Sequence, residues 1–286
     1  MAVHDRRYRR YTGPLTAEPT RFLVLARYCL REIFRPRGFM ALFTTSLMFP
    51  LACAALIYVE HNLSLMTRLP VDLAAMIPID ARFFETFLWV QTAMAFLMTL
   101  VIVPGIVAPD LVNGALPLYL SHPLTRTGYL AGKAASLVAL LSAITWIPGS
   151  LLFLLEGSLA GRAWLLGSSR LLFGVVAGSF TAIVAFALPA LAIAIHYRSK
   201  SRGRTALVFL AFVAGAAGKI ANDVLEVTWG DVLMAPRVLE TVYANALGGE
   251  AYASLTLPGA LAAIGTVCVL SIAVIARRLR AYEVVA

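Results

Sequence analysis

The sequence has 286 residues, of which 60% are hydrophobic and 14% are charged. A soluble domain carries about 25% charged residues, so this composition excludes an ordinary soluble protein and indicates a multi-pass membrane protein. The net charge of +9 is compatible with nucleic-acid binding, but the basic residues cluster in short segments beside apolar runs, which is the topology signal of membrane proteins, and we expect no nucleic-acid partner.

The first 38 residues are rich in arginine and contain no apolar core region, so we expect no cleavable signal peptide there. Residues 1–19 form a basic arm that we place in the cytoplasm. Two interpretations of it stay open. The arm either binds anionic lipid headgroups, at about 1 kcal/mol per basic residue near the surface, or only sets the topology.

The segment from Thr20 to Arg35 predicts an amphipathic helix that begins at Thr20 as N-cap and ends at Pro36. Apolar residues fall on one helical face and arginines on another: Phe22, Leu25, Cys29 and Ile33, against Arg27, Arg31 and Arg35. We expect the helix to lie in the membrane interface, apolar face toward the lipid, because three arginines are costly in hydrocarbon. The alternative is an extension of the first membrane helix.

Six apolar segments follow, each long enough at 1.5 Å per residue to cross roughly 30 Å of hydrocarbon. They cover residues 39–59, 86–107, 130–155, 170–195, 205–221 and 255–276. The fifth is the shortest and contains Lys219, which must snorkel or face protein. The sequence therefore predicts an all-α polytopic protein, with residues 1–38 as arm and interfacial helix and residues 39–286 as a six-helix membrane domain.

The basic residues predict the orientation of these spans. One side collects eighteen Lys and Arg residues, in the N-terminal arm, the 108–133 stretch, the 196–204 loop and the C-terminal tail, and the other side has six. By the positive-inside rule, both termini and the 108–133 stretch are cytoplasmic. Of the external segments, 222–254 predicts one or two short amphipathic helices on, or dipping into, the outer leaflet; an ordinary external loop is the alternative.

Inside the spans the sequence offers little chemistry. Glu85, Gln91 and Glu156 fall near span ends, where we expect them to reach water, so no span shows the buried Asp, Glu or His of a proton-coupled carrier. The four histidines are scattered, the three cysteines are widely separated, and no ATP-binding loop occurs, so we expect no metal, haem or other cofactor in this chain. Gly174 and Gly178 form a GxxxG pair and are candidates for helix packing between two copies.

The stretch from Ala108 to Lys133 separates the second and third spans and is too polar to cross a bilayer. Prolines and glycines predict short turns in it rather than one long helix: Pro109, Pro117 and Pro123, with Gly114 and Gly128. A polar, structured loop of this length between two spans is a candidate docking surface.

The stretch also carries an ordered set of residues: Asp110, Gly114, Leu118, Leu120, Pro123 to Arg126, Tyr129, Leu130, Gly132 and Lys133. Together with the basic interfacial helix and six spans, this pattern resembles the permease subunits of the second class of ABC exporters. The resemblance covers nearly the whole chain, while its informative motif is confined to residues 108–133. Ala115 stands where the family usually has threonine, and Pro117 interrupts a segment that is often helical.

The resemblance implies a permease without its motor. Two permease copies, or this chain with a homologous permease, would pair with two copies of a cytoplasmic ABC ATPase that holds the ATP and magnesium. The coupling segment 108–133 and the interfacial helix would sit on the ATPase. Asp110 and Arg126 would be polar contacts or local braces, Gly114 a close backbone approach, and Lys133 an anchor at the headgroups, with Pro123 in the same set. Solvated residues that only set topology are the alternative.

The expected function is therefore that of a transport subunit rather than an enzyme: the permease of an ATP-driven exporter in the bacterial cytoplasmic (inner) membrane, with membrane lipids as further partners. The alternative is a structural membrane subunit of a larger complex that transports nothing itself. A secondary carrier is not favoured, because the sequence shows no inverted repeat.

Overall fold

The structure is a computed structural model that describes residue 17 and residues 20–62, 78–114, 125–197, 199–249 and 254–280. The residues in these ranges form helices and no strand. Six helical segments are long and apolar enough to cross a membrane: α2 (Arg37–His61), α4 (Ala81–Val112), α6 with α7 (Arg126–Ile144 and Trp146–Ala160), α9 (Ser169–Tyr197), α10 (Lys200–Leu225) and α12 (Leu257–Arg280). The prediction of an all-α multi-pass membrane protein with six spans is therefore confirmed.

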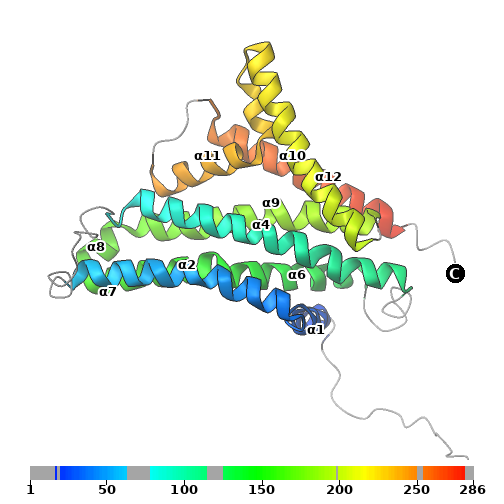
Figure 1. The fold of residues 1–286 in the computed structure, drawn as a ribbon, viewed down its shortest axis with the longest axis horizontal. Coiled ribbons are helices and arrows are strands. Elements are labelled where there is room, and N and C mark those ends of the chain that lie inside the picture. Colours follow the sequence, from blue (N-terminus) through cyan, green and yellow to red (C-terminus); the bar gives the residue numbers. More distant parts are fainter. Residues whose placement is uncertain are drawn as a thin grey trace, which may run out of the picture.

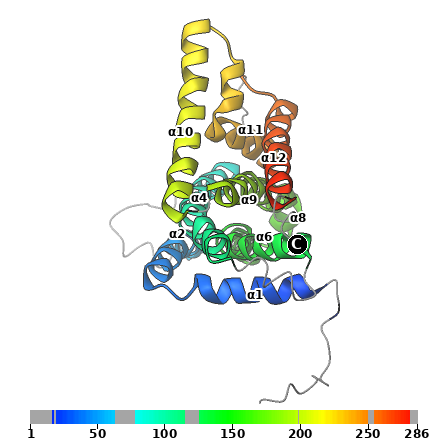
Figure 2. The ribbon, with the colours of Figure 1, turned by 90° about the vertical axis from the view of Figure 1, so that its right-hand side faces the viewer.

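Shorter helices accompany the spans: α1 (Arg21–Ile33), α8 (Arg162–Gly167), η3 (Trp229–Leu233) and α11 (Ala235–Leu247). The helices α2, α4, α6, α7 and α9 run side by side as an elongated bundle, from which α10 leans away (Figure 1). Helix α1 is seen end-on in Figure 1 and lengthwise in Figure 2, so it lies across the bundle. We call the end of the bundle that carries α1 the α1 end, and the end that carries α8 the opposite end.

The second span is longer than the predicted 86–107 because both of its ends are stabilised. At its start, the Asp80 carboxylate accepts hydrogen bonds from the backbone N–H groups of Arg82 and Phe83, at 2.8 and 3.1 Å. This is an N-cap that satisfies two of the free donors of the first turn. At its other end the helix continues through Pro109 to Val112, so the prediction that Pro109 begins a run of short turns is wrong.

The third span is broken in its middle. Thr145 has φ −106° and ψ −95°, which ends α6, and α7 begins at the next residue. Pro148 follows in the first turn of α7 and has no N–H to offer to the carbonyl of Ile144, so a continuous helix cannot form there. The Thr145 hydroxyl donates to the Leu141 carbonyl at 2.8 Å. The predicted single helix over 130–155 is therefore two helices in one span.

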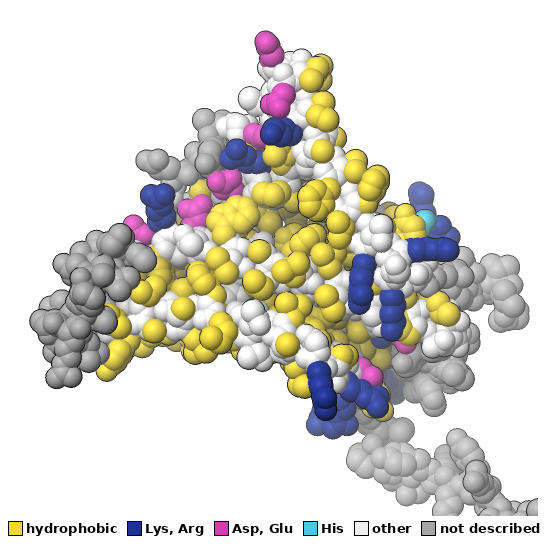
Figure 3. Space-filling model, in the orientation of Figure 1, with side chains coloured by type: hydrophobic (Ala, Val, Ile, Leu, Met, Phe, Trp, Pro, Cys, Tyr) yellow, Lys and Arg dark blue, Asp and Glu magenta, His cyan; other side chains and the backbone are white. Residues whose placement is uncertain are grey.

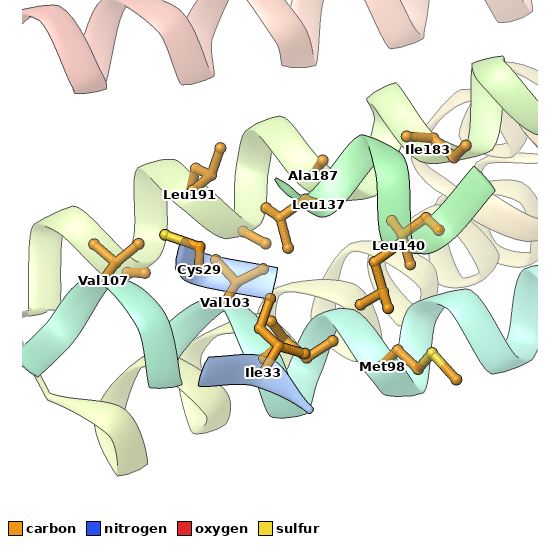
Figure 4. Close-up of a cluster of buried hydrophobic side chains, with 14 of the residues drawn as sticks. Cys29, Ile33, Met98, Val103, Val107, Leu137, Leu140, Ile183, Ala187 and Leu191 are labelled. Atoms are coloured by element: carbon orange, nitrogen blue, oxygen red, sulfur yellow. The ribbon is translucent and has the colours of Figure 1, made fainter. Parts of the chain in front are cut away.

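Two apolar clusters hold the bundle together, one toward each end. Figure 4 shows the cluster toward the α1 end, where Cys29 and Ile33 of α1 lie among side chains of α4, α6 and α9. Lipid tails are as apolar as these side chains, so close van der Waals packing, rather than escape from water, selects these contacts within the membrane.

Helix α11 occupies part of the 222–254 segment, where the sequence predicts short helices at the outer leaflet. Its apolar face does not lie in lipid, because its buried side chains pack against α4, α9 and α12: Val238, Leu239, Val242, Tyr243 and Leu247. The hydroxyl of Tyr243 lies 2.7 Å from that of Thr92 on α4. Burial raises the pKa of the Tyr243 phenol far above its usual value. Helix α11 is thus an integral part of the packed structure.

Gly174 and Gly178 make the α11 contact possible. A Cβ atom at Gly174 would lie 2.7 Å from a methyl group of Leu247 and 3.0 Å from the backbone of Ala246, and one at Gly178 would lie 3.0 Å from the ring of Tyr243. Both glycines are buried within one chain. The expectation that they pair two copies is therefore wrong, since α11 of the same chain already covers their face.

Enlarging Gly174 should loosen α11. We expect Gly174→Leu to lower the free energy of unfolding in detergent by about 1–3 kcal/mol, the usual cost of overpacking. Thermal unfolding followed by circular dichroism measures this. Gly265→Leu on α12 is the control, because no described atom outside its own helix backbone lies within 4 Å of a Cβ placed there. Equal stability of the two variants would contradict the tight α9–α11 contact.

The charge distribution predicts that the α1 end of the bundle is cytoplasmic. Figure 3 shows Lys and Arg gathered around the α1 end, while the visible Asp and Glu lie mainly toward α10 and α11. With Cys29, Cys53 and Cys268 replaced by alanine, an impermeant maleimide added outside intact cells should label Arg162→Cys and leave Lys200→Cys unlabelled until the cells are opened. Both positions are exposed. Labelling of position 200 in intact cells would reverse or reject this topology.

Candidate functional site

In the structure, the two ends of the predicted coupling segment 108–133 belong to helices α4 and α6. Residues 108–112 are the last turn of α4, and residues 126–133 are the first two turns of α6. Thr125 caps α6, its hydroxyl accepting a hydrogen bond from the N–H of Gly128 at 3.0 Å. The prediction of short turns through the whole stretch is therefore wrong at both ends. Pro123 and the rest of residues 115–124 lie outside the described residues.

Asp110 and Lys133 form a buried ion pair between these two helices. The Lys133 ammonium lies 2.7 Å from Asp110 Oδ2, and the two side chains are 5% and 16% exposed. The same ammonium donates to the Ile106 carbonyl at 2.8 Å, and the Tyr129 hydroxyl donates to Asp110 Oδ2 at 2.9 Å. The expectation that Lys133 is an anchor at the headgroups is wrong, because its charge is turned inward to α4.

These contacts make Asp110 a brace within the chain. A buried carboxylate that accepts from both an ammonium and a phenol has most of its lost hydration replaced. Because Lys133 also reaches the backbone of α4, the last turn of α4 and the second turn of α6 are connected at two points. Of the two roles expected for Asp110, polar contact to a partner and local brace, the geometry supports the brace.

Helix α1 covers this ion pair. A Cβ at Gly132 would lie 2.9 Å from both a methyl group of Leu25 and the carbonyl oxygen of Phe22. The backbone of α6 therefore lies directly against both the backbone and a side chain of α1. The Cys29 thiol of α1 interacts with Lys133; burial raises its pKa above the usual value, and the lysine acts in the opposite direction. Sequence reasoning quoted Gly132 only as part of a motif and did not identify it as the contact that positions α1.

The predicted faces of α1 are present, but their surroundings differ from the expectation. Leu25, Cys29 and Ile33 are buried against the protein rather than turned toward lipid. Arg27 and Arg31 are exposed, together with Leu23, Val24 and Tyr28. Arg35 lies beyond the helix, with its guanidinium 3.8 Å from the Glu32 carboxylate. The outer face of α1 is therefore a mixed surface of arginines and apolar side chains.

Two further predicted residues lie beside the brace. Gly114 has φ +63° directly after the C-cap of α4, a conformation that favours glycine, and no described atom lies within 4 Å of a Cβ placed there. Within the chain its role is thus conformational, and its approach to a partner stays a prediction. Arg126 is the first residue of α6 and is half-buried, rather than part of a loop.

A cavity of about 660 Å³ opens at this end between α1, α4 and the start of α10. Apolar residues of α1 and α4 line one part of it. Charged side chains line the rest: Glu32, Asp110, Lys133, Lys200 and Arg204. The Arg204 guanidinium donates to the Val101 carbonyl at 3.2 Å, which ties α10 to α4 close to Pro104. The α1 end thus joins four helices through polar contacts made in an apolar setting.

Two polar residues of the spans, Gln91 and Glu156, are buried, so the expectation that they reach water is wrong. Gln91 is fully buried and donates to the Ser46 carbonyl at 3.1 Å. Glu156 is 4% exposed, with its carboxylate 3.6 Å from the His61 imidazole. Sequence reasoning missed this pair because Glu156 and His61 are far apart in the chain and each lies at the end of its own span.

Breaking the buried ion pair should destabilise the protein. Lys133→Met keeps the bulk of the side chain but leaves Asp110 buried without its cation, so we expect a loss of roughly 3–5 kcal/mol in the free energy of unfolding. Adding Asp110→Asn should restore part of that loss, and Asp110→Asn is also measured alone. Lys200→Met, at an exposed position, is the matched control. Thermal unfolding in detergent gives all four values, and additive effects of the two substitutions would contradict direct pairing.

Compared with models of known protein families and with curated protein sequences, the chain matches none. The structure by itself establishes a multi-pass membrane protein of six helical spans. At one end, a short helix lies across the bundle over a buried Asp110–Lys133 pair.

Proposed function

We propose that the chain is the membrane permease subunit of an ATP-driven ABC exporter in the bacterial cytoplasmic membrane, and that it couples to a separate ATPase through its α1 end. The observation that supports this most is the way α1 is attached. It lies across the spans, is seated on Gly132 of α6, and covers the ion pair that connects α6 to α4. A displacement of α1 would therefore be transmitted to α4 and α6 together.

The outer surface of α1 has the chemistry of a docking surface for the proposed ATPase. Arg27 and Arg31 are exposed there among the apolar side chains of Leu23, Val24 and Tyr28. Such a surface complements an apolar groove with acidic residues at its rim, and interfaces are rich in arginine and aromatic residues. ATP and magnesium would be bound by the partner, and the residues of α1 and of the segment between α4 and α6 would receive its movement.

A second permease copy must meet this one through spans that are not already covered. The face of Gly174 and Gly178 is covered by α11. Helices α10 and α12 expose large apolar side chains along much of their length, among them Phe209, Phe212 and Val269. We assign these two helices to contacts with lipid and with the second copy.

Charge reversal on α1 tests the coupling. Co-expressed with a candidate ABC ATPase partner that the wild-type chain recovers, a tagged chain carrying Arg27→Glu and Arg31→Glu should recover at least about tenfold less ATPase than the wild type, because losing a charge pair in an interface costs roughly 2–5 kcal/mol. Expression and thermal stability should stay near wild type, since both arginines are exposed and surface substitutions usually change stability by about 0.5 kcal/mol or less.

Arg162→Glu on α8 is the control for each of the two substitutions, because it makes the same Arg→Glu change at an exposed position of the opposite end. Arg126→Glu at the start of α6 extends the test to the segment beyond α4. If wild type and all variants recover the same amount of ATPase with the same turnover, the docking role of the α1 end is rejected. A stable complex with membrane subunits and no ATPase would instead support the structural subunit.

A further inference from the structure

Three ligand-type side chains meet at the opposite end of the bundle. Glu60 and His61 stand at the end of α2, and Glu156 stands in the last turns of α7. One ligand atom from each lies within 4.8 Å of those of the other two. His61 Nε2 and Glu156 Oε1 are 3.6 Å apart. This cluster is distant from the α1 end and takes no part in the proposed coupling.

The histidine is held in the tautomer that suits a ligand. His61 Nδ1 lies 3.1 Å from the Ile57 carbonyl, and a carbonyl oxygen can only accept, so Nδ1 carries the proton in this contact. In the neutral ring Nε2 then has a lone pair, and that lone pair faces the Glu156 carboxylate. A backbone carbonyl that orients the second ring nitrogen is the usual support of a metal-binding histidine.

The glutamate is buried without enough partners. The Glu156 side chain is 5% exposed, and among the described residues its Oε2 atom has no hydrogen-bond partner. The buried Oε2 atom of Glu60 has none either. Buried polar atoms in proteins nearly always have a partner, and an unpaired buried carboxylate is costly. Both carboxylates of this cluster therefore carry an unpaired buried oxygen beside a ring lone pair, an arrangement that a positive species bound between the three side chains would satisfy.

We propose that Glu60, His61 and Glu156 bind a divalent transition-metal cation, best represented by Zn²⁺, that bridges α2 and α7. The charge balances, because two carboxylates and a neutral imidazole together carry the charge that one Zn²⁺ neutralises. The donor set of one imidazole nitrogen and carboxylate oxygens is one that zinc accepts, with bonds of about 2.0–2.2 Å. Ligand atoms of a tetrahedral site are then about 3.4 Å apart, close to the 3.6 Å between His61 and Glu156.

The bound cation would stabilise the packing of α2 against α7 at the opposite end. Helices α2 and α7 lie side by side there, and the site closes the gap between their last turns. The cation would hold these turns together and leave a coordination position for water. The competing explanation is a single proton shared between His61 and Glu156, which would neutralise only part of the charge. The experiment separates the two.

Zinc binding to the purified full-length chain in detergent measures the site. After metal removal with a chelator, calorimetric titration with ZnCl₂ should show one Zn²⁺ per chain, and zinc should raise the melting temperature of the wild type. His61→Gln and Glu156→Gln should each raise the Kd by about tenfold or more, since even the loss of an outer-shell partner costs 10–100-fold in metal affinity. Cobalt in place of zinc should give the intense visible absorption of a four-coordinate site.

Two matched controls share the residue types. His196→Gln lies at the other end of the bundle, where the ring contacts Arg278 at 3.2 Å, and Glu85→Gln lies in α4 outside the cluster. Both should bind zinc as the wild type does. The proposal is overturned if the wild type does not bind zinc, or if its affinity is the same in the cluster variants as in the controls. If a cluster variant does not fold, the cobalt spectrum of the wild type decides, and the weak spectrum of six-coordinate cobalt rejects the site.

Discussion

The buried contact between Asp110 and Lys133 is the constraint on which the α1 end depends. Neither charge can be buried alone, so α4 and α6 must hold their ends at a fixed distance for each to satisfy the other. Lys133 adds a hydrogen bond to the Ile106 carbonyl, and Tyr129 adds one to Asp110, so the pair also fixes the rotation of both helices. Helix α1 is seated on this arrangement and would lose its support if the helices moved apart. The brace therefore fixes where α1, and with it the exposed face of α1, lies on the bundle.

Two of the short helices that pack on the spans, α1 and α11, are seated by glycines of a span. At Gly132 of α6 and at Gly174 of α9, a methyl group would overlap atoms of the docked helix. In a membrane, where escape from water does not favour one apolar contact over another, close approach of backbones is the main source of attraction. This explains why α11 packs against α9 rather than lying in the outer leaflet. It also explains why Gly174 and Gly178 read as a dimer motif in the sequence: the signature of close packing does not say whether the neighbour belongs to the same chain.

The six spans could be predicted from the sequence because the length of an apolar run is a local property. Helix α4 extends beyond its predicted start from the Asp80 cap, and α2 and α10 extend beyond theirs without a side-chain cap. The buried face of α1 followed from periodicity, which is also a local property. What could not be predicted is which partner satisfies a polar residue. Lys133 reads as an interfacial anchor when only its neighbours in sequence are known, and its inward direction depends on Asp110 and Ile106, which lie on another helix. The function attached to the 108–133 motif rests on a resemblance and stays a proposal.

The two ends of the bundle treat buried charge in different ways. At the α1 end, the Asp110 carboxylate is matched by a cation and a phenol from the same chain, so its charge is satisfied without a ligand. At the opposite end, the Glu156 side chain is more deeply buried, 5% exposed against 16% for Asp110, yet one of its oxygens has no partner among the described residues. With the proposed metal ion bound there, the free energy of folding of that end depends on the metal concentration. In the proposed permease, such an end could change its packing with the bound ion without disturbing the attachment of α1 to α6.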